Sequence, residues 1–312
     1  MKIWSNLKLY TKFRKLVADF NPDLILIPIS QSTTGFLKDS IYVLLAGKRS
    51  RVILMLHGSN ILKWLQNSPS WVNRYFSRIM KKANGVVVLG HKLKYLFSDW
   101  FREEQIHVVP NGLNFTFKPV FKISEDLINV RFMGSLIRSK GILEVVKAVS
   151  LLQEKYNNFN LIINGIWRDK RLKYEVEEII SQKSLPVKYE GEVTGNEKEK
   201  AYLNSEIFIF TPNKPEGHPY VIIEAMAAGL PIISTDQGAI TESVIDGVNG
   251  FIVKPNCPEE IADRLRYLIE NPKERLRMGR ESRRLYEENF TEEKMVERLA
   301  EVFNKVLSQN QL

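Results

Sequence analysis

Short runs rich in Val, Ile and Leu alternate with amphipathic stretches along almost the whole chain, and this alternation constrains the fold most. The runs are too apolar to keep one face in water, so they predict strands that are buried on both faces. Such strands are typical of parallel sheets covered by helices, and the pattern predicts an α/β protein with doubly wound sheets. The expected strands are 23–29, 51–56, 85–89, 106–109, 129–133, 160–163, 186–189, 207–210, 231–234 and 250–253.

The pattern divides the chain into two domains. It is interrupted around 115–127, where Pro119 and polar residues replace the apolar periodicity. A length of 312 residues is sufficient for two domains of ordinary size. We therefore expect a first domain over 1–120 and a second over 128–288. A final amphipathic helix over 291–308 is expected to dock, and the first domain is a candidate surface.

The charge of the chain is unevenly distributed. Residues 1–120 contain 18 Lys and Arg against 6 Asp and Glu, whereas the remainder contains 27 against 30. An anionic partner would therefore meet the first half. Nucleic acid is not expected, because no helix-turn-helix or RNA-binding signature accompanies the charge.

The single cysteine and the hydropathy bear on location. Cys257 alone cannot form an internal disulfide, which fits a reducing compartment. The first residues lack a long apolar region, and no apolar run approaches the roughly 20 residues of a membrane-spanning helix. We expect a cytoplasmic protein, or one that lies on the inner membrane face without crossing it.

One strand exit carries residues suited to binding an anion. The expected strand 207–210 leads into a loop with Gly217, which lets backbone approach a ligand, and Pro219, which suits the first turn of a helix. The amides that follow would be free to bind a diphosphate. Glu216 precedes this turn and Glu224 follows roughly 7–8 Å along the helix, so the two carboxylates could bind two sugar rings. The alternative is that Glu216 caps the helix and Glu224 is an ordinary surface residue.

A second exit carries two cations. Arg138 and Lys140 precede a helix that begins near Gly141, where the helix dipole alone would favour anions. They could neutralise the charge that grows on a departing nucleoside diphosphate. The alternative is a solvated loop with two surface cations.

Taken together, these segments resemble glycosyltransferase family 4. The resemblance rests on Pro110-Asn111-Gly112, then the loop from Gly134 to Gly141, then Glu216 to Glu224 continuing as Ala-Met-Ala-Ala-Gly-Leu-Pro-Ile-Ile. It covers nearly the whole chain, and 212–238 is its most specific part. It implies a GT-B architecture of two Rossmann-like domains facing across a cleft, retention of anomeric configuration, and no metal or other cofactor. The chain contains no Asp-x-Asp motif.

The resemblance also implies roles for individual residues. The carboxylate matching Glu216 touches the transferred sugar, the one matching Glu224 holds the ribose, and His57 faces the sugar from the first domain. The implied catalytic residues are Glu216, Arg138, Lys140 and His57. The implied donor-binding residues are Gly134, Ser135, Gly217, His218, Pro219, Tyr220, Val221 and Glu224. From the residues alone, a single His after a strand is more often structural than catalytic.

The chain departs from the family pattern in three places. The family begins with a strand and a glycine-rich turn, and about two βα units are missing before Asp23, so the first domain is expected to be incomplete. Ser135 stands where the family usually has Arg, and Arg138 of the same loop is expected to substitute. Residues 164–167 read Asn-Gly-Ile-Trp where a Gly-x-Gly turn is typical.

The basic first domain contains a candidate membrane-binding helix. Apolar and aromatic residues of 71–82 fall on one helical face with cations beside them, a pattern that can lie in an anionic interface. The alternative is that this face packs into the domain core.

The leading hypothesis is a retaining, metal-independent hexosyltransferase. It would move a sugar from a nucleotide-sugar donor to a saccharide or lipid-linked acceptor in bacterial surface-polysaccharide or lipopolysaccharide synthesis. One alternative is a non-catalytic or partner-dependent shortened paralogue that binds nucleotide sugar. Another is a GT-B epimerase, which the spacing of Glu216 and Glu224 fits less well.

Overall fold

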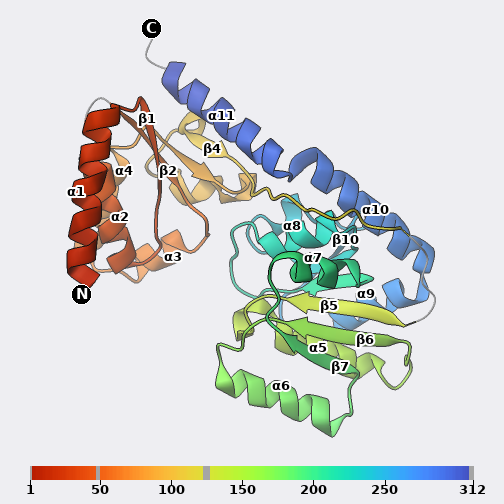
Figure 1. Ribbon diagram of the computed structural model, residues 1–312. Coiled ribbons are helices and arrows are strands. Elements are labelled where there is room, and N and C mark those ends of the chain that lie inside the picture. The colour runs from red at the N-terminus through yellow and green to blue at the C-terminus, as the bar shows by residue number, and fades with distance from the viewer. Residues whose placement is uncertain (1, 47–49, 122–126, 309–312) are drawn as a thin grey trace. The chain divides into compact units, whose positions relative to one another are not determined.

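The computed structural model describes residues 2–46, 50–121 and 127–308, and the side chains from residue 7 onward within these ranges. The chain forms two compact units (Figure 1). Unit 1 comprises Met1–Pro110 together with Met295–Leu312, and unit 2 comprises Asn111–Lys294.

Unit 1 is built on a four-stranded parallel sheet in the order β1-β2-β3-β4. The strands are β1 (Leu24–Pro28), β2 (Arg51–Met55), β3 (Gly85–Val88) and β4 (Ile106–Val108), and the four expected strands are thus confirmed. The expectation of a shortened first domain concerns βα units that the family carries before these strands, and it stays a prediction.

Helices cover the sheet of unit 1 and enclose an aromatic cluster. Phe36 packs against Trp64 and Phe76, and Phe76 packs against Trp100. The C-terminal helix α11 (Glu292–Ser308) continues into unit 1, where the Arg51 guanidinium donates a hydrogen bond to the Val306 carbonyl. The other helices are α1 (Lys2–Phe20), α2 (Thr33–Leu45), α3 (Ile61–Gln66), α4 (Ser70–Met80), η1 (His91–Phe97) and η2 (Glu103–Gln105).

The apolar face of α4 belongs to the core of unit 1. Val72, Phe76, Ile79 and Met80 are buried, while Trp71 is 50% exposed. The structure therefore supports the second reading of 71–82, in which the cations are solvated and the apolar stripe packs inward.

Unit 2 is built on a six-stranded parallel sheet in the order β10-β9-β8-β5-β6-β7. Each expected strand of this unit is confirmed, but β7 is an edge strand that exposes Lys188, Tyr189 and Glu190 rather than a fully buried one. The strands are β5 (Ile128–Met133), β6 (Phe159–Asn164), β7 (Val187–Gly191), β8 (Ile207–Phe210), β9 (Ile232–Thr235) and β10 (Gly250–Val253).

The strand order places a topological switch point between β5 and β8, the two neighbours from which the connections run in opposite directions. Helix α5 packs against α6 and α9, and helix α8 packs against α7 and α10. In such a sheet, ligands collect where the carboxyl ends of these two central strands meet. The helices are α5 (Ile142–Leu152), α6 (Lys170–Gln182), α7 (Gly195–Leu203), α8 (Tyr220–Ala227), α9 (Pro258–Glu270) and α10 (Pro272–Asn289), with the short turns η3 (Arg138–Lys140) and η4 (Ile240–Glu242).

Hydropathy along the helices bears on membrane insertion. Across residues 2–46, 50–121 and 127–308, no helix combines the length and the apolar composition that crossing a membrane requires.

Candidate functional site

Two loops meet at the switch point of unit 2. The first joins β5 to α5 over residues 134–141, and the second joins β8 to α8 over residues 211–219. The Asn213 amide donates to the Ser139 carbonyl at 3.1 Å, which ties one loop to the other. Both sequence segments selected for their chemistry therefore lie at one edge of one sheet.

Gly141 makes this approach of the loops possible. Its φ is +84°, and a Cβ there would lie 2.0 Å from the Thr211 carbonyl oxygen. An L residue would have to adopt a left-handed backbone and also push the second loop away. The glycine that begins α5 therefore fixes the distance between the loops.

Lys140 and Glu216 form the central contact of the site. The Lys140 Nζ lies 2.6 Å from the Glu216 Oε1, and their side chains are 24% and 15% exposed. The same ammonium lies 5.6 Å from the centroid of the Phe210 ring. A half-buried carboxylate and a cation are thus held together beside the start of α8, where an anionic ligand can exchange contacts with both.

Arg138 points elsewhere. Its guanidinium bonds the carboxylate of Glu175 on α6, and that hydrogen bond is the largest influence raising the pKa of Arg138. Both side chains are exposed, at 51% and 40%. The fold thus separates the two cations that the sequence places two residues apart, and only Lys140 faces Glu216.

The start of α8 presents free backbone donors. Pro219 precedes the helix in an extended conformation, and the first amides of an α-helix, here those of Tyr220 and Val221, lack acceptors within the helix. Together with the dipole of the helix they favour an anion. Tyr220 is 46% exposed, so this end of α8 is open to a ligand.

His218 is enclosed within unit 2. Its Nδ1 accepts a hydrogen bond from the Asn111 amide at 3.1 Å, and its Nε2 lies 2.5 Å from the Ser243 hydroxyl. The Asn111 side-chain amide donates to the His218 carbonyl at 2.7 Å. Burial lowers the pKa of His218 to about 4, so the imidazole is neutral. The His218 side chain is therefore engaged within unit 2, and the residue is only 3% exposed.

Glu224 is held by two side chains that sequence reasoning missed. Its Oε1 lies 2.5 Å from the Lys198 Nζ, and its Oε2 accepts a hydrogen bond from the Tyr202 hydroxyl at 2.9 Å. Lys198 and Tyr202 are four residues apart on α7 and therefore share a helix face, which is the only sequence signal for them. Beside them lies a cavity of about 290 Å³, which is also lined by Leu113, Asn114, Phe115 and Tyr220.

The other residues predicted from the sequence lie in the two loops of unit 2 and after β2 of unit 1. Gly134 follows β5 directly, and its amide donates to the Asn164 carbonyl at 3.1 Å, while Ser135 is exposed. Gly217 is buried, and its carbonyl accepts from the Ala239 amide at 2.9 Å. His57 belongs to unit 1, where it follows β2 and is exposed.

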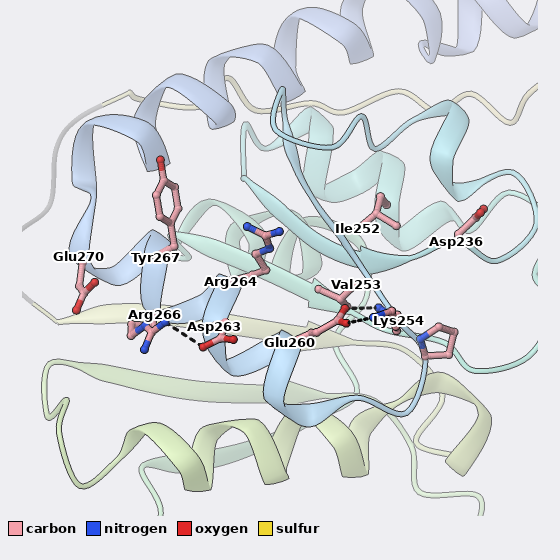
Figure 2. A pocket seen from close by; sticks show the side chains of 11 residues that line it. Asp236, Ile252, Val253, Lys254, Glu260, Asp263, Arg264, Arg266, Tyr267 and Glu270 are labelled. Carbon is pink, nitrogen blue, oxygen red and sulfur yellow. Dashed lines mark hydrogen bonds and ion pairs between the residues drawn. The ribbon is translucent and has the colours of Figure 1, made fainter.

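A larger hollow of unit 2 lies apart from these residues. It is lined by residues of β10 and α9 and has a volume of about 760 Å³. Figure 2 shows the side chains that line it. Lys254 and Glu260 lie 2.8 Å apart in it, and Arg266 and Asp263 lie 3.0 Å apart. Its charged side chains thus largely neutralise one another, and its lining includes none of the residues predicted from sequence.

Acidic, histidine and cysteine side chains are the usual protein ligands of metal ions. Among the described residues, no three of them gather in a group that could hold a metal ion.

Comparisons with known proteins follow the division into units closely. A family model described as Glycosyl transferases group 1 matches residues 115–285, and one described as Glycosyltransferase Family 4 matches residues 1–117. The chain is 26% identical to an uncharacterised glycosyltransferase of Methanocaldococcus jannaschii over 296 residues, which cover 89% of this chain and 73% of the relative.

A further relative and a similar solved structure carry more specific descriptions. The capsular polysaccharide biosynthesis glycosyltransferase CapM of Staphylococcus aureus is 24% identical over 244 residues, covering 78% of this chain and 62% of CapM. The crystal structure of Anabaena HepE in complex with UDP-glucose has a TM-score of 0.77 at 19% identity, covering 95% of this chain and 82% of HepE. At 19% identity, the likeness to HepE shows a shared fold.

Proposed function

The chain belongs to the glycosyl transferases of group 1, and from this premise we propose that it is a retaining enzyme that takes its donor on unit 2. The reaction would move a hexose from a nucleotide sugar to a saccharide or lipid-linked acceptor in surface-polysaccharide synthesis. The observation that carries the proposal is the Lys140–Glu216 pair, 2.6 Å long, beside the open start of α8.

In this proposal each side chain has one task. The diphosphate of the donor lies against the first amides of α8, and Lys140 stabilises the charge that develops on it as the sugar departs. Glu216 accepts hydrogen bonds from the hydroxyls of the transferred sugar and so orients it. When Arg138 exchanges its contact with Glu175 for the diphosphate, it binds the diphosphate together with Lys140. The role proposed for His57, which belongs to unit 1, is to face the transferred sugar.

Because the proposed reaction retains configuration and no nucleophile is assigned among the described residues, we propose that attack occurs on the face from which the diphosphate departs. The bond from the anomeric carbon to the diphosphate breaks, and the bond to the acceptor oxygen forms on the same face of the sugar. The acceptor proton passes to the departing diphosphate. Product configuration, read by NMR of the anomeric proton, tests this: an inverted product would exclude retention.

UDP-sugars are the first donors to test, because the structurally similar HepE was crystallised with UDP-glucose. UDP-, GDP- and ADP-sugars should be screened for thermal stabilisation, since a ligand that binds only the folded state must raise the melting temperature. The best donor is then assayed for transfer with wild type and Glu216→Ala. We expect binding by both and transfer by wild type alone. Retained turnover in Glu216→Ala would remove Glu216 from the mechanism.

The same assay separates the alternatives. Donor binding by wild type without transfer or hydrolysis would favour the non-catalytic, nucleotide-sugar-binding reading. Metal independence is tested by adding EDTA to the transfer reaction, where we expect an unchanged rate. A rate restored only by a divalent cation would contradict that part of the proposal.

We further propose that unit 1 meets an anionic membrane through α1, which would bring a lipid-linked acceptor near the enzyme. Helix α1 contacts α2 through Tyr10 and Phe13, whose rings both lie against Tyr42. Other positions of α1 are exposed and combine an apolar stripe with adjacent cations, a pattern that suits an anionic interface. These are Leu9, Leu16 and Phe20, at 52%, 54% and 80% exposure, beside exposed Lys8, Lys12 and Lys15.

Liposome flotation tests this surface. We expect wild type to float with anionic vesicles and not with neutral ones, and Leu16→Ser/Phe20→Ser to stay in the soluble fraction. Those side chains are exposed, so the double variant should keep the melting temperature of wild type. Equal absence of wild type from both vesicle fractions at low salt would refute the proposal.

A further inference from the structure

We infer that Lys198 is a positioning residue of the donor site, which fixes Glu224 in the orientation that binds the nucleoside of the donor. The inference rests on the proposed function and extends it to α7, which sequence reasoning did not include in the site. It also assigns Tyr202 of the same helix as the second support of Glu224.

The geometry couples α7 to α8 through one carboxylate. Each oxygen of Glu224 has its own partner, Lys198 Nζ at 2.5 Å and Tyr202 Oη at 2.9 Å. The side chains of Lys198 and Glu224 are 30% and 16% exposed, so the pair is shielded from much of the solvent. A carboxylate held at both oxygens by a second helix has little rotational freedom left.

Tyr202 can act only as a donor in this arrangement. Its side chain is fully buried, and burial, followed by the charge of Glu224, raises its pKa well above the usual value. The hydroxyl therefore stays protonated and donates to the carboxylate. A carboxylate can accept more than two hydrogen bonds, so Glu224 can still accept others. Ribose hydroxyls could donate to Glu224 from the adjoining cavity of about 290 Å³.

Lys198 also compensates a charge. A donor diphosphate is anionic, and a bare carboxylate close to it would repel it. The site has the same arrangement at its other glutamate, since Lys140 pairs with Glu216 as Lys198 pairs with Glu224. Both glutamates of the donor segment are therefore already neutralised and oriented when the donor binds.

The test measures UDP binding by calorimetry, with GDP and ADP in parallel, in wild type, Lys198→Met, Glu224→Gln and the double variant. Loss of a hydrogen bond to a charged group weakens binding about tenfold or more, so we expect about that loss in Lys198→Met. If Lys198 acts through Glu224, the double variant binds no more weakly than the poorer single variant. Lys198→Arg should restore the affinity to within about threefold of wild type.

Controls separate this role from simple stabilisation. Tyr202→Phe removes the second support of Glu224, together with a longer hydrogen bond of 3.4 Å to the Val221 carbonyl, and should also weaken UDP binding. Lys254→Met, which breaks the exposed Lys254–Glu260 pair in the same unit, should not. Additive losses in the double variant, or unchanged UDP binding by Lys198→Met, would overturn the inference and leave the proposed function intact. Failure of wild type to bind any of the three nucleotides would instead overturn the donor site itself.

Discussion

The Lys140 ammonium lies 2.6 Å from the Glu216 carboxylate, although 76 residues separate the two in the chain. The pair joins the loops that follow β5 and β8, the two strands at the switch point of the sheet. Because opposite charges on the two loops neutralise one another here, the free protein can hold both groups half-buried and ready for a charged ligand.

Lys140→Met should reduce transfer far more than it reduces stability. Removing one group that stabilises transition-state charge typically costs about 10²–10³ in kcat. We expect a loss of that order, measured by steady-state transfer from a saturating donor. Lys254→Met is the matched control, because its pair with Glu260 also lies in unit 2 but outside the site. A loss in kcat below about tenfold would argue against a role for Lys140 in leaving-group departure.

Glu175→Gln should strengthen donor binding. In the free protein Glu175 holds Arg138, so a donor diphosphate must compete for that guanidinium. Removing the competing charge should lower the donor KM several-fold, while the exposed pair contributes at most about 1 kcal/mol to stability. Glu177→Gln is the control, since its pair with Lys173 lies on the same helix. A raised donor KM in Glu175→Gln, with the control unchanged, would contradict this release of Arg138.

Protonation of His218 should destabilise the protein in mild acid. Burial depresses its folded pKa to about 4, against 6.5 for an unperturbed histidine. Well above pH 6.5 the imidazole is neutral in both the folded and the unfolded state. Between pH 6.5 and about pH 4 the unfolded state binds a proton that the folded state does not, so the free energy of unfolding falls as the pH is lowered.

The size of this effect can be isolated with His218→Asn, whose side-chain oxygen can replace Nδ1 as the acceptor for Asn111. Between pH 7.5 and 4.5, wild type should lose between about 2 and 3 kcal/mol more unfolding free energy than the variant. Urea unfolding at both pH values measures it. Parallel losses in the two proteins would mean that His218 does not titrate in this window.

Gly238→Ala should displace Glu216 and reduce transfer. Gly238 has φ +62°, and a Cβ there would lie 1.8 Å from the Glu216 carbonyl oxygen. Gly247 is the control, with φ +73° and no atom of the described residues within 4 Å of a Cβ, so its alanine variant bears only the backbone strain of about 1–2 kcal/mol. We expect the Gly238 variant to melt lower than the control and to lose activity. Equal melting temperatures and activities would show that the 216–219 loop can shift without a loss of stability or of transfer.

Much of the fold could be predicted because strand formation is decided locally. All ten expected strands lie within two residues of the observed bounds at either end. The apolar run of each strand is enough to identify it, and parallel pairing follows from burial on both faces. The edge position of β7 could not be predicted, since the number of neighbours of a strand depends on the whole sheet.

The candidate site was predictable as a set of segments but not as a set of contacts. The turn residues Gly217 and Pro219 indicated a helix start, and two charged loops at strand ends indicated a ligand edge. Nothing local distinguishes Arg138 from Lys140, yet one bonds Glu175 and the other Glu216. Lys198 was missed because its relation to Glu224 exists only once α7 packs against α8.

By itself, the sequence determined the order of strands and helices, the two α/β domains, and which loops carry the charged residues. These properties follow from periodicity and from the backbone preferences of single residues, which act over a few positions. Only the tertiary structure decided which cation faces which carboxylate, that His218 is enclosed and neutral, and that α7 supplies both partners of Glu224. Those outcomes depend on rotamers and burial, which are set by elements distant in the chain, so no local pattern contains them.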